Sequence, residues 1–231
     1  VRGDMDVLKD RIAIGQYLKL MGLLNKCLID PLAKLWSCAP KMVKWDASTG
    51  SYPPPRGKPT RTVVFAGSFN PPHAGHLEII RYLAAAHKQV HVVIGVNPFK
   101  TYPVSAEVRK EIIEGMVQGS DLQNVQVHIW GDAIFKLAKL LGATALYRGL
   151  RSWEEDGKAE RHLEVQNLCW PTLSSCGTPM STYYVEGPQA HKSTSSTLLR
   201  NRIKSGEPIN DIVPECVVQK VLGAYGEAVK N

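Results

Sequence analysis

The chain has 231 residues, of which 44% are hydrophobic and 21% charged, as in an ordinary soluble globular protein. No apolar run approaches the roughly 20 residues that cross a bilayer, so no membrane span is expected. Its 28 Lys and Arg against 21 Asp and Glu give a formal net charge of +7. This balance suits anionic partners such as nucleotides and phosphorylated metabolites, although it also simply promotes solubility. No nucleic-acid-binding motif is indicated.

The cysteines and the start of the chain bear on the compartment. The chain has 5 cysteines, an odd number, and no Cys-x-x-Cys pair, which indicates neither a disulfide framework nor a zinc site. Free thiols in an intracellular, reducing compartment are therefore expected. No secretory signal pattern is visible, and the early Asp4, Asp6, Asp10 and Asp30 make a cleaved transit peptide a poor fit. Cytoplasm, mitochondrion and chloroplast all remain open.

Residues 1–60 differ from the rest and are expected to form an N-terminal helical extension. The sequence Ser-Tyr-Pro-Pro-Pro-Arg-Gly-Lys-Pro over residues 51–59 predicts an extended linker, so we place a domain boundary near residue 60. Residues 61–231 then form one α/β domain. The helix either packs on that domain or docks on another protein. Its predicted apolar stripe consists of Leu8, Ile12, Tyr17, Leu20, Met21 and Leu24.

Short strands and helices alternate after residue 61. Stretches rich in Val and Ile predict buried parallel strands at residues 62–66, 90–96, 125–130, 143–147 and 182–185. Helices are expected at residues 75–87, 105–117, 132–141, 195–203 and 214–229. Ser105 is expected to cap a helix and Gly142 to close one. The order predicts a Rossmann-like, doubly wound, five-stranded parallel sheet with its site beyond the carboxyl ends of the strands.

Residues 67–76, Gly-Ser-Phe-Asn-Pro-Pro-His-Ala-Gly-His, leave the first strand and enter the first helix. Gly67 lets the backbone turn closely past a phosphate, and Gly75 lets the helix begin without a side chain in the way. His73 and His76 are three residues apart, so both rings lie on one side of the helix start. Two imidazoles beside free backbone N–H groups predict a polyphosphate site. A metal site would need a third ligand, and none is evident at suitable spacing.

This segment resembles the His-x-Gly-His signature of the nucleotidyltransferase superfamily, whose members transfer a nucleoside monophosphate from a nucleoside triphosphate. The second signature of the superfamily is similar to residues 194–200, Thr-Ser-Ser-Thr-Leu-Leu-Arg. These residues open a late helix, where hydroxyl and N–H groups can hold the β- and γ-phosphates. Together the two signatures imply a nucleotide site on the Rossmann-like sheet.

Three further features resemble bacterial-type phosphopantetheine adenylyltransferase, which forms dephospho-coenzyme A and pyrophosphate from ATP and 4′-phosphopantetheine. They are Lys100 after the second strand, Asp-Ala-Ile at residues 132–134 after the third, and Arg-Gly-Leu-Arg at residues 148–151 after the fourth. The last feature discriminates best, because relatives acting on nicotinamide mononucleotide or glycerol phosphate lack it. The resemblance runs over residues 62–225 and does not include the extension.

The resemblance implies roles for particular residues. Ser68, His76 and Lys100 would be catalytic, acting at the α-phosphate and the attacking phosphate. Mg²⁺ would enter with ATP and bridge phosphate oxygens, without direct ligands from the protein. The implied nucleotide-binding residues are Gly67, Phe69, His73, Gly75, Gly149, Arg151, Glu160, Ser195, Ser196 and Thr197. The implied acceptor-binding residues are Ser68, Lys100, Ala133, Ile134, Arg148 and Asn167.

Departures from the family leave the acceptor open. Ser68 and His73 stand where the adenylyltransferase usually has Thr. Asn201 falls where a Glu is usual near the acceptor, and His191 where an aromatic residue often meets the nucleotide. The Asn-Pro-Pro-His sequence of the first loop is also typical of nicotinamide-mononucleotide adenylyltransferases. An enzyme that acts on that acceptor or on another small phosphate ester is therefore the alternative.

A hypothesis of another class follows from the extension. Residues 1–60 would suit a structural subunit of a larger assembly that keeps a cytidylyltransferase-like nucleotide-binding fold. The resemblance instead implies a homo-oligomer, commonly a hexamer. In such a subunit the nucleotide site could be retained, altered or inactive, and the nearly complete set of catalytic residues favours retained nucleotide binding.

Overall fold

The computed structural model describes residues 22–23, 25–35, 38–54, 61–97, 100–173, 179–191 and 193–230. All six residues of the predicted N-terminal stripe lie outside these ranges, as do residues 55–59 of the predicted linker. Within the described ranges, no helix is both long enough and apolar enough to span a bilayer. The four cysteines at positions 27, 38, 169 and 216 are free thiols, and Cys176 is outside the described residues.

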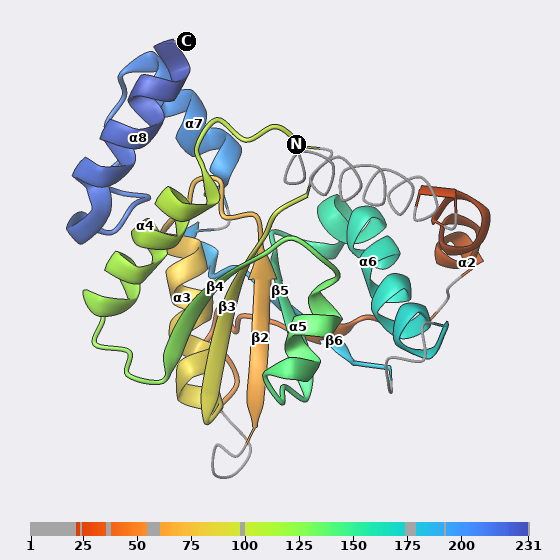
Figure 1. The fold of residues 1–231 in the computed structure, drawn as a ribbon. Helices are drawn as coiled ribbons and strands as arrows, with labels where there is room; N and C mark the ends of the chain where they lie inside the picture. Colours follow the sequence, from red (N-terminus) through yellow and green to blue (C-terminus); the bar gives the residue numbers. More distant parts are fainter. Residues whose placement is uncertain are drawn as a thin grey trace, which may run out of the picture.

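A parallel sheet of six strands forms the centre of the described fold, in the order β1-β6-β5-β2-β3-β4 (Figure 1). From β2 the chain moves outward to β3 and β4, then returns to β5 on the other side of β2. The point where the winding reverses therefore lies between β2 and β5. The strands are β1 (Lys41–Val43), β2 (Thr62–Gly67), β3 (Gln89–Gly95), β4 (Val125–Trp130), β5 (Ala145–Leu150) and β6 (Thr182–Glu186).

Helices cover both faces of the sheet, with α3 and α4 on one side and α5 and α6 on the other (Figure 1). A further apolar cluster joins α4 to α7 and α8. The helices are α2 (Asp30–Leu35), α3 (Ala74–Ala86), α4 (Ala106–Gln118), α5 (Ile134–Leu140), α6 (Trp153–Leu173), α7 (Ser196–Ser205) and α8 (Val218–Lys230). Shorter helical segments are η1 (Asn25–Ile29), η2 (Gln189–His191) and η3 (Glu215–Val217).

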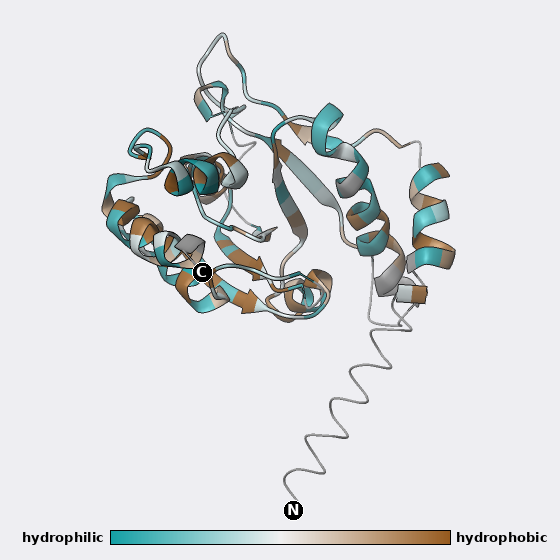
Figure 2. Ribbon diagram, turned by 90° about the horizontal axis from the view of Figure 1, so that it is seen from above, coloured by the Kyte–Doolittle hydropathy of each residue, from teal (hydrophilic) through white to brown (hydrophobic). Residues whose placement is uncertain are grey.

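The central strands carry apolar residues on both sides, because both of their faces are covered. Val63, Val64 and Phe65 follow one another in β2 and are all at most 1% exposed. Figure 2 shows the same pattern as brown stretches along the strands. Such unbroken burial is typical of parallel strands between two helix layers. The predicted doubly wound α/β fold is confirmed.

The local signals for helix ends are also confirmed. The Ser105 hydroxyl accepts the Val108 N–H at 3.3 Å and caps α4. Gly142 closes the turn after α5 with a φ of 65°, in the left-handed region that favours glycine. Both features depend on a few neighbouring residues, which explains why the sequence predicts them.

The predicted strand count of five was wrong, because residues 41–43 form the additional edge strand β1. This strand pairs in parallel with β6, with Lys41 opposite Tyr183. Farther on, Tyr52 is 9% exposed, packs against the Tyr82 ring, and donates its hydroxyl to the Glu186 carbonyl at 2.8 Å. Residues 41–54 are thus part of the α/β unit, so the predicted boundary near residue 60 does not hold for them. Three residues of strand are too few to show a sequence periodicity.

The described part of the N-terminal extension packs back on α6. Ile29 is fully buried, and Asp30 Oδ1 lies 2.9 Å from His162 Nδ1. The Arg161 side chain donates to the Cys38 carbonyl at 2.8 Å. Of the two predicted arrangements for the extension, packing on the domain is therefore observed for this part.

Other element bounds shift by a few residues. The fourth predicted strand was expected to end at residue 147, but β5 continues to Leu150, which pairs with Glu186 of β6. Its neighbour β6 supplies hydrogen-bond partners that the sequence pattern does not reveal. Helix α5 begins at Ile134, two residues later than predicted, and the last helix begins with the 3₁₀ turn η3.

Candidate active site

A cavity of about 330 Å³ opens between β2 and β5, at the point where the winding reverses. The ends of β2, β5 and β6 border it, together with the beginnings of α3, α6 and α7. The predicted site residues that line it are Ser68, His73, Gly75, His76, Gly149, Arg151, Glu160, Ser195 and Ser196. The other lining residues, which the site prediction did not include, are Ile79, Leu150, Asp156, Gly187, His191 and Thr194.

The loop between β2 and α3 has an unusual backbone at Phe69, whose φ is 46°. A non-glycine residue in this region costs on the order of 1–3 kcal/mol, so surrounding contacts must hold it. The Phe69 ring packs edge-on against Phe65 and His76, with centroids 5.4 and 4.9 Å away. A Cβ added to Gly67 would lie 3.0 Å from the Phe69 ring. Gly67 therefore makes room for the Phe69 ring. This is a second reason for a glycine at position 67, besides the predicted close approach of a phosphate.

The C-terminal helices hold the same loop from the other side. The Tyr225 hydroxyl donates to Asn70 Oδ1 at 2.8 Å, and Arg200 Nη1 donates to the Asn70 carbonyl. The Ser196 hydroxyl donates to the Pro71 carbonyl at 2.8 Å. The two sequence signatures are therefore in direct contact, and the second one shapes the first.

The two histidines at the start of α3 stack, with ring centroids 3.7 Å apart. The prediction that both rings lie on one side of the helix start is confirmed. The His73 backbone N–H donates to His76 Nδ1 at 3.2 Å. In a neutral imidazole the proton is then on Nε2. Burial lowers the pKa of His76 to about 3, so His76 is a neutral hydrogen-bond donor at neutral pH.

His73 and His191 each bury a ring nitrogen, Nδ1, that has no hydrogen-bond partner among the described residues. Burial, and next the neighbouring His76 and His191, hold the pKa of His73 well below its usual range. A buried polar atom without a partner costs about 1–3 kcal/mol, so a ligand or a water molecule bound here would supply the partner. A Cβ added to Gly75 would lie 3.2 Å from the His73 ring and 3.4 Å from His191 Cβ. Glycine at position 75 thus lets these imidazoles approach one another.

The Ser/Thr signature begins α7 at the cavity wall. The Ser195 hydroxyl accepts the Leu198 N–H at 3.1 Å and is therefore the N-cap of this helix. The helix start adds backbone N–H groups and the positive end of the helix dipole, which favour a phosphate. Thr197 is exposed and outside the cavity lining, and its hydroxyl accepts a hydrogen bond from Arg200.

Arg148 and Glu160 form a two-pronged ion pair behind the cavity. Nε and Nη2 of Arg148 donate to the two carboxylate oxygens at 2.9 and 2.7 Å, and Nη1 donates to the Ala66 carbonyl at 3.0 Å. A guanidinium has five N–H groups, so one hydrogen on each terminal nitrogen remains for another acceptor. The pair orients Arg148 through Glu160, a carboxylate that the resemblance implied would bind the nucleotide.

Arg151 lies at the cavity mouth with 47% of its side chain exposed. Its Nη2 lies 2.6 Å from Asp156 Oδ1, and its Nη1 lies 3.0 Å from Glu155 Oε2. Although burial raises the pKa of Asp156, hydrogen bonds from Arg151 lower it below the usual value overall. Two arginines therefore engage the two carboxylates that line the cavity, Asp156 and Glu160.

The structure does not bring Asn167 into the site. Its side chain donates to the Thr182 hydroxyl at 3.2 Å, at the amino end of β6 and away from the carboxyl ends. With a rise of 1.5 Å per residue, α6 carries Asn167 about 10 Å beyond Glu160 along the helix axis. Asn167 therefore lies outside the lining of this cavity, and its acceptor contact stays a prediction.

Lys100, Ala133 and Ile134 follow β3 and β4 and do not line the cavity. Lys100 has an exposed side chain, and its N–H donates to the Asn97 carbonyl at 3.0 Å. Ala133 and Ile134 begin α5, and Ile134 packs into the apolar cluster under that helix. The roles implied for these residues stay predictions.

Arg109 is a supporting residue that the site prediction did not include. It is 1% exposed, and Nη1 donates to the Ser68 carbonyl in the loop. The available signal was its position within α4, on the same buried side as Ile112, Ile113 and Met116. A charged residue on the apolar side of a predicted helix indicates a buried partner.

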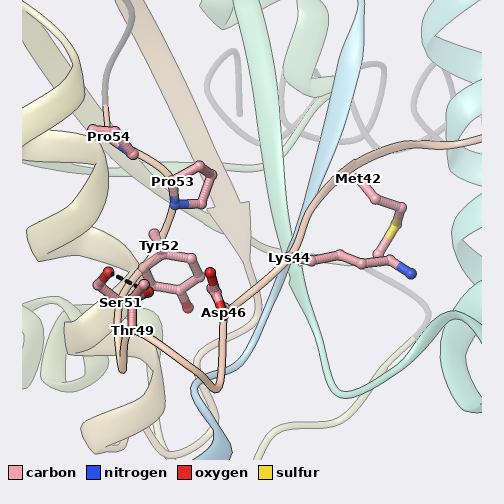
Figure 3. Close-up of a pocket in the computed structure, with 8 residues that line it drawn as sticks. All are labelled: Met42, Lys44, Asp46, Thr49, Ser51, Tyr52, Pro53 and Pro54. Carbon is pink, nitrogen blue, oxygen red and sulfur yellow. Dashed lines mark hydrogen bonds between the residues drawn. The ribbon is translucent and has the colours of Figure 1, made fainter.

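A second hollow, of about 440 Å³, lies beside the segment that follows β1. Figure 3 shows its lining, which includes Lys44, Asp46 and Tyr52, and the 3.0 Å hydrogen bond between the Thr49 and Ser51 hydroxyls. No residue of either sequence signature borders this hollow. We therefore place the chemistry in the cavity between β2 and β5.

Comparisons with known proteins show the family of the chain. The cytidylyltransferase-like family matches residues 64–202. A phosphopantetheine adenylyltransferase from Streptococcus pneumoniae is 33% identical over 159 residues, which cover 68% of this chain and 93% of the relative. Another, from Micrococcus luteus, is 30% identical over 164 residues, or 71% of this chain and 98% of the relative. A third, from Bifidobacterium longum, is 29% identical over 164 residues, or 71% and 94%.

A similar solved structure is that of a nicotinate-nucleotide adenylyltransferase from Vibrio parahaemolyticus. Its TM-score is 0.50 at 17% identity, covering 71% of this chain and 99% of that chain, which supports the fold. The sheet, the switch-point cavity and the two signatures define a nucleotidyltransferase-type α/β protein. The chain belongs to the cytidylyltransferase-like family, and within it the enzyme is similar to phosphopantetheine adenylyltransferases.

Proposed function

We propose that the protein transfers AMP from ATP to 4′-phosphopantetheine and releases pyrophosphate. The observation that supports this most is the cavity itself, where the His-x-Gly-His helix start, the Arg-Gly-Leu-Arg strand end and the Ser/Thr helix start meet. The curated relatives that bear this name, at about 30% identity, point to the same acceptor.

The cavity supplies the means for an in-line attack on the α-phosphorus of ATP. An acceptor phosphate oxygen forms a bond to that phosphorus as the bond to pyrophosphate breaks, and no covalent enzyme intermediate is needed. His76 Nε2–H and backbone N–H groups would donate to oxygens on which charge develops. Ser195 and Ser196, at the start of α7, would hold the departing phosphates.

The acceptor would meet Arg148 and Ser68. Arg148 has 25% of its side chain exposed and two N–H hydrogens left for a phosphate. Its ion pair with Glu160 would hold the guanidinium plane in place, so less side-chain freedom is lost when the acceptor binds. Lys100, exposed after β3, would reach the reacting phosphates by a movement of its side chain.

The donor set fits a magnesium ion that arrives with ATP. Asp156 and Glu160 are engaged by Arg151 and Arg148, so phosphate oxygens and water would hold the ion. When bound, magnesium neutralises part of the triphosphate charge. The residues around it would only orient the phosphates.

The direct test is pyrophosphate release by the 231-residue chain with ATP and magnesium. Turnover is expected with phosphopantetheine and not with nicotinamide mononucleotide or nicotinate mononucleotide. The His76→Asn variant is expected to lower kcat about 10²- to 10³-fold, because the shorter Asn side chain lacks the Nε2–H that donates to the transition state. His87→Asn, at the other end of α3, is the matched control and should retain kcat. Turnover of a mononucleotide acceptor instead would establish the alternative enzyme.

A structural role remains the hypothesis of another class. The described N-terminal part presents Leu23 and Leu35 with 60% and 80% exposure, and a contiguous apolar patch around them would suit contact with another protein. Sizing the native complex from its source separates the two hypotheses. A small homo-oligomer supports the free enzyme, whereas co-migration with a large particle supports a subunit.

A further inference from the structure

Arg109 is a buried cation that forms no ion pair among the described residues, although the charge of Glu107 on the same helix acts to raise its pKa. Its side chain is 1% exposed, and the Tyr102 ring lies 4.3 Å from its Cζ atom. Among the described residues, no carboxylate lies within ion-pair distance of the guanidinium. Burying such a charge is costly, so its contacts must compensate for the lost hydration.

Those contacts link α4 to the loop of the cavity. Nη1 of Arg109 donates to the Ser68 carbonyl, and Nε donates to the Ser105 carbonyl at 3.2 Å. The next residue, Phe69, has the left-handed backbone, and Asn70 beyond it is held from α7 and α8. The strained residue therefore lies between two fixed points, of which Arg109 is the one next to Ser68.

We propose that Arg109 is a positioning residue for nucleotidyl transfer, which fixes the Ser68 carbonyl and thereby aims the Ser68 side chain at the reacting phosphates. This inference rests on the proposed function. The planar guanidinium suits the task because it donates to two carbonyls at once, from α4 and from the loop. Its charge also places a positive potential behind a loop that receives a polyanion.

The test is a double-mutant cycle between Arg109→Met and Ser68→Ala, with pyrophosphate release as the readout. Arg109→Met is expected to lower kcat about 10- to 100-fold, as for a misplaced catalytic group. In the Ser68→Ala background the same change should cost less than about threefold, because the group it positions is already absent. Arg81→Met, which removes an exposed arginine on α3, is the control and should leave kcat unchanged.

The outcomes separate positioning from a merely structural role. Losses that multiply in the double variant would show that Arg109 acts independently of Ser68, and would overturn the proposal. If Arg109→Met does not fold, Arg109→Lys takes its place in the cycle, because it keeps the charge. The single ammonium of lysine does not reproduce both hydrogen bonds, so this variant should fold and still lower kcat. Wild-type kcat in Arg109→Lys would also overturn the proposal.

Failure of the proposed function would look different. In that case the wild-type chain itself shows no turnover with phosphopantetheine. The double-mutant cycle is then measured by calorimetry, with the affinity for ATP and magnesium as its readout. Non-additive losses there support the positioning of Ser68 by Arg109, and additive losses overturn it.

Discussion

At the scale of single residues, buried imidazoles set the electrostatics of the cavity. The pKa of His76 is lowered to about 3 by burial, and that of His73 is held well below its usual range, first by burial. Both rings are therefore neutral at neutral pH and act as hydrogen-bonding groups without charge. Binding of a polyanion would then depend on helix starts and arginines for its electrostatic attraction.

The same burial predicts an acid-sensitive fold. In the unfolded chain His76 has its usual pKa of 6.5, so below that pH the unfolded state takes up a proton that the folded state excludes. The contribution of the neutral His76 to the free energy of unfolding is therefore fully present above pH 6.5 and is lost as the pH falls toward 3. Replacing His76 with Gln should reduce the slope of the free energy of unfolding against pH by up to about 1.4 kcal/mol per pH unit. Urea unfolding of both proteins between pH 7 and pH 4, at constant ionic strength, measures the difference. The same dependence of the free energy of unfolding on pH in both proteins would contradict the lowered pKa of His76.

At the scale of elements, the loop between β2 and α3 is shaped by packing around a glycine. The Phe69 ring is 2% exposed and occupies the space beside Gly67. Tyr225 and Arg200 fix Asn70 from the C-terminal helices. The active-site loop thus depends on three separate parts of the chain.

The Gly67→Ala variant tests this packing. Its new Cβ would lie 3.0 Å from the Phe69 ring, which has little room to move. We expect a loss of about 1–3 kcal/mol in the free energy of unfolding and a lower kcat/KM for ATP. Gly223→Ala in α8 is the matched control, since an added Cβ there meets no atom within 4 Å. The control should gain up to about 1 kcal/mol from helix propensity. Equal effects of the two changes would contradict the packing role of Gly67.

At the scale of the whole molecule, the α/β unit reaches back into the predicted extension. Strand β1 adds an edge to the sheet, and Tyr52 inserts between Trp45 and Tyr82, with centroids 4.9 and 4.6 Å from those rings. Burial of an aromatic ring here stabilises the fold although Tyr52 does not border the proposed active site.

Substitution of Tyr52 tests whether the segment before residue 61 stabilises the α/β unit. Tyr52→Ala should cost about 3–5 kcal/mol in the free energy of unfolding, because it leaves a cavity among aromatic rings. Tyr52→Phe should cost only about 1 kcal/mol, the value of the lost hydrogen bond to Glu186. Denaturant unfolding compares the two with the wild type, and kcat of the folded variants serves as the control. A loss below 1 kcal/mol in Tyr52→Ala would mean that residues 61–231 fold without this segment.

The sequence by itself determined the features that depend on neighbouring residues. Apolar runs predicted the central strands, a serine and a glycine marked helix ends, and the loop at residues 67–76 predicted the position of the cavity. These signals are local, because backbone geometry and helix capping involve residues only a few positions apart. Most of the cavity lining was therefore predictable.

Only the tertiary structure decided which distant groups share a contact. It joined β1 to β6 across about 140 residues and paired Arg148 with Glu160. It also carried Asn167 away from the cavity along α6, and brought Arg109 to the Ser68 carbonyl. Such contacts depend on how elements pack and in what register, which the chemistry of one residue and its neighbours does not specify. The sequence thus located the candidate nucleotide site, and packing selected the residues that hold it in shape.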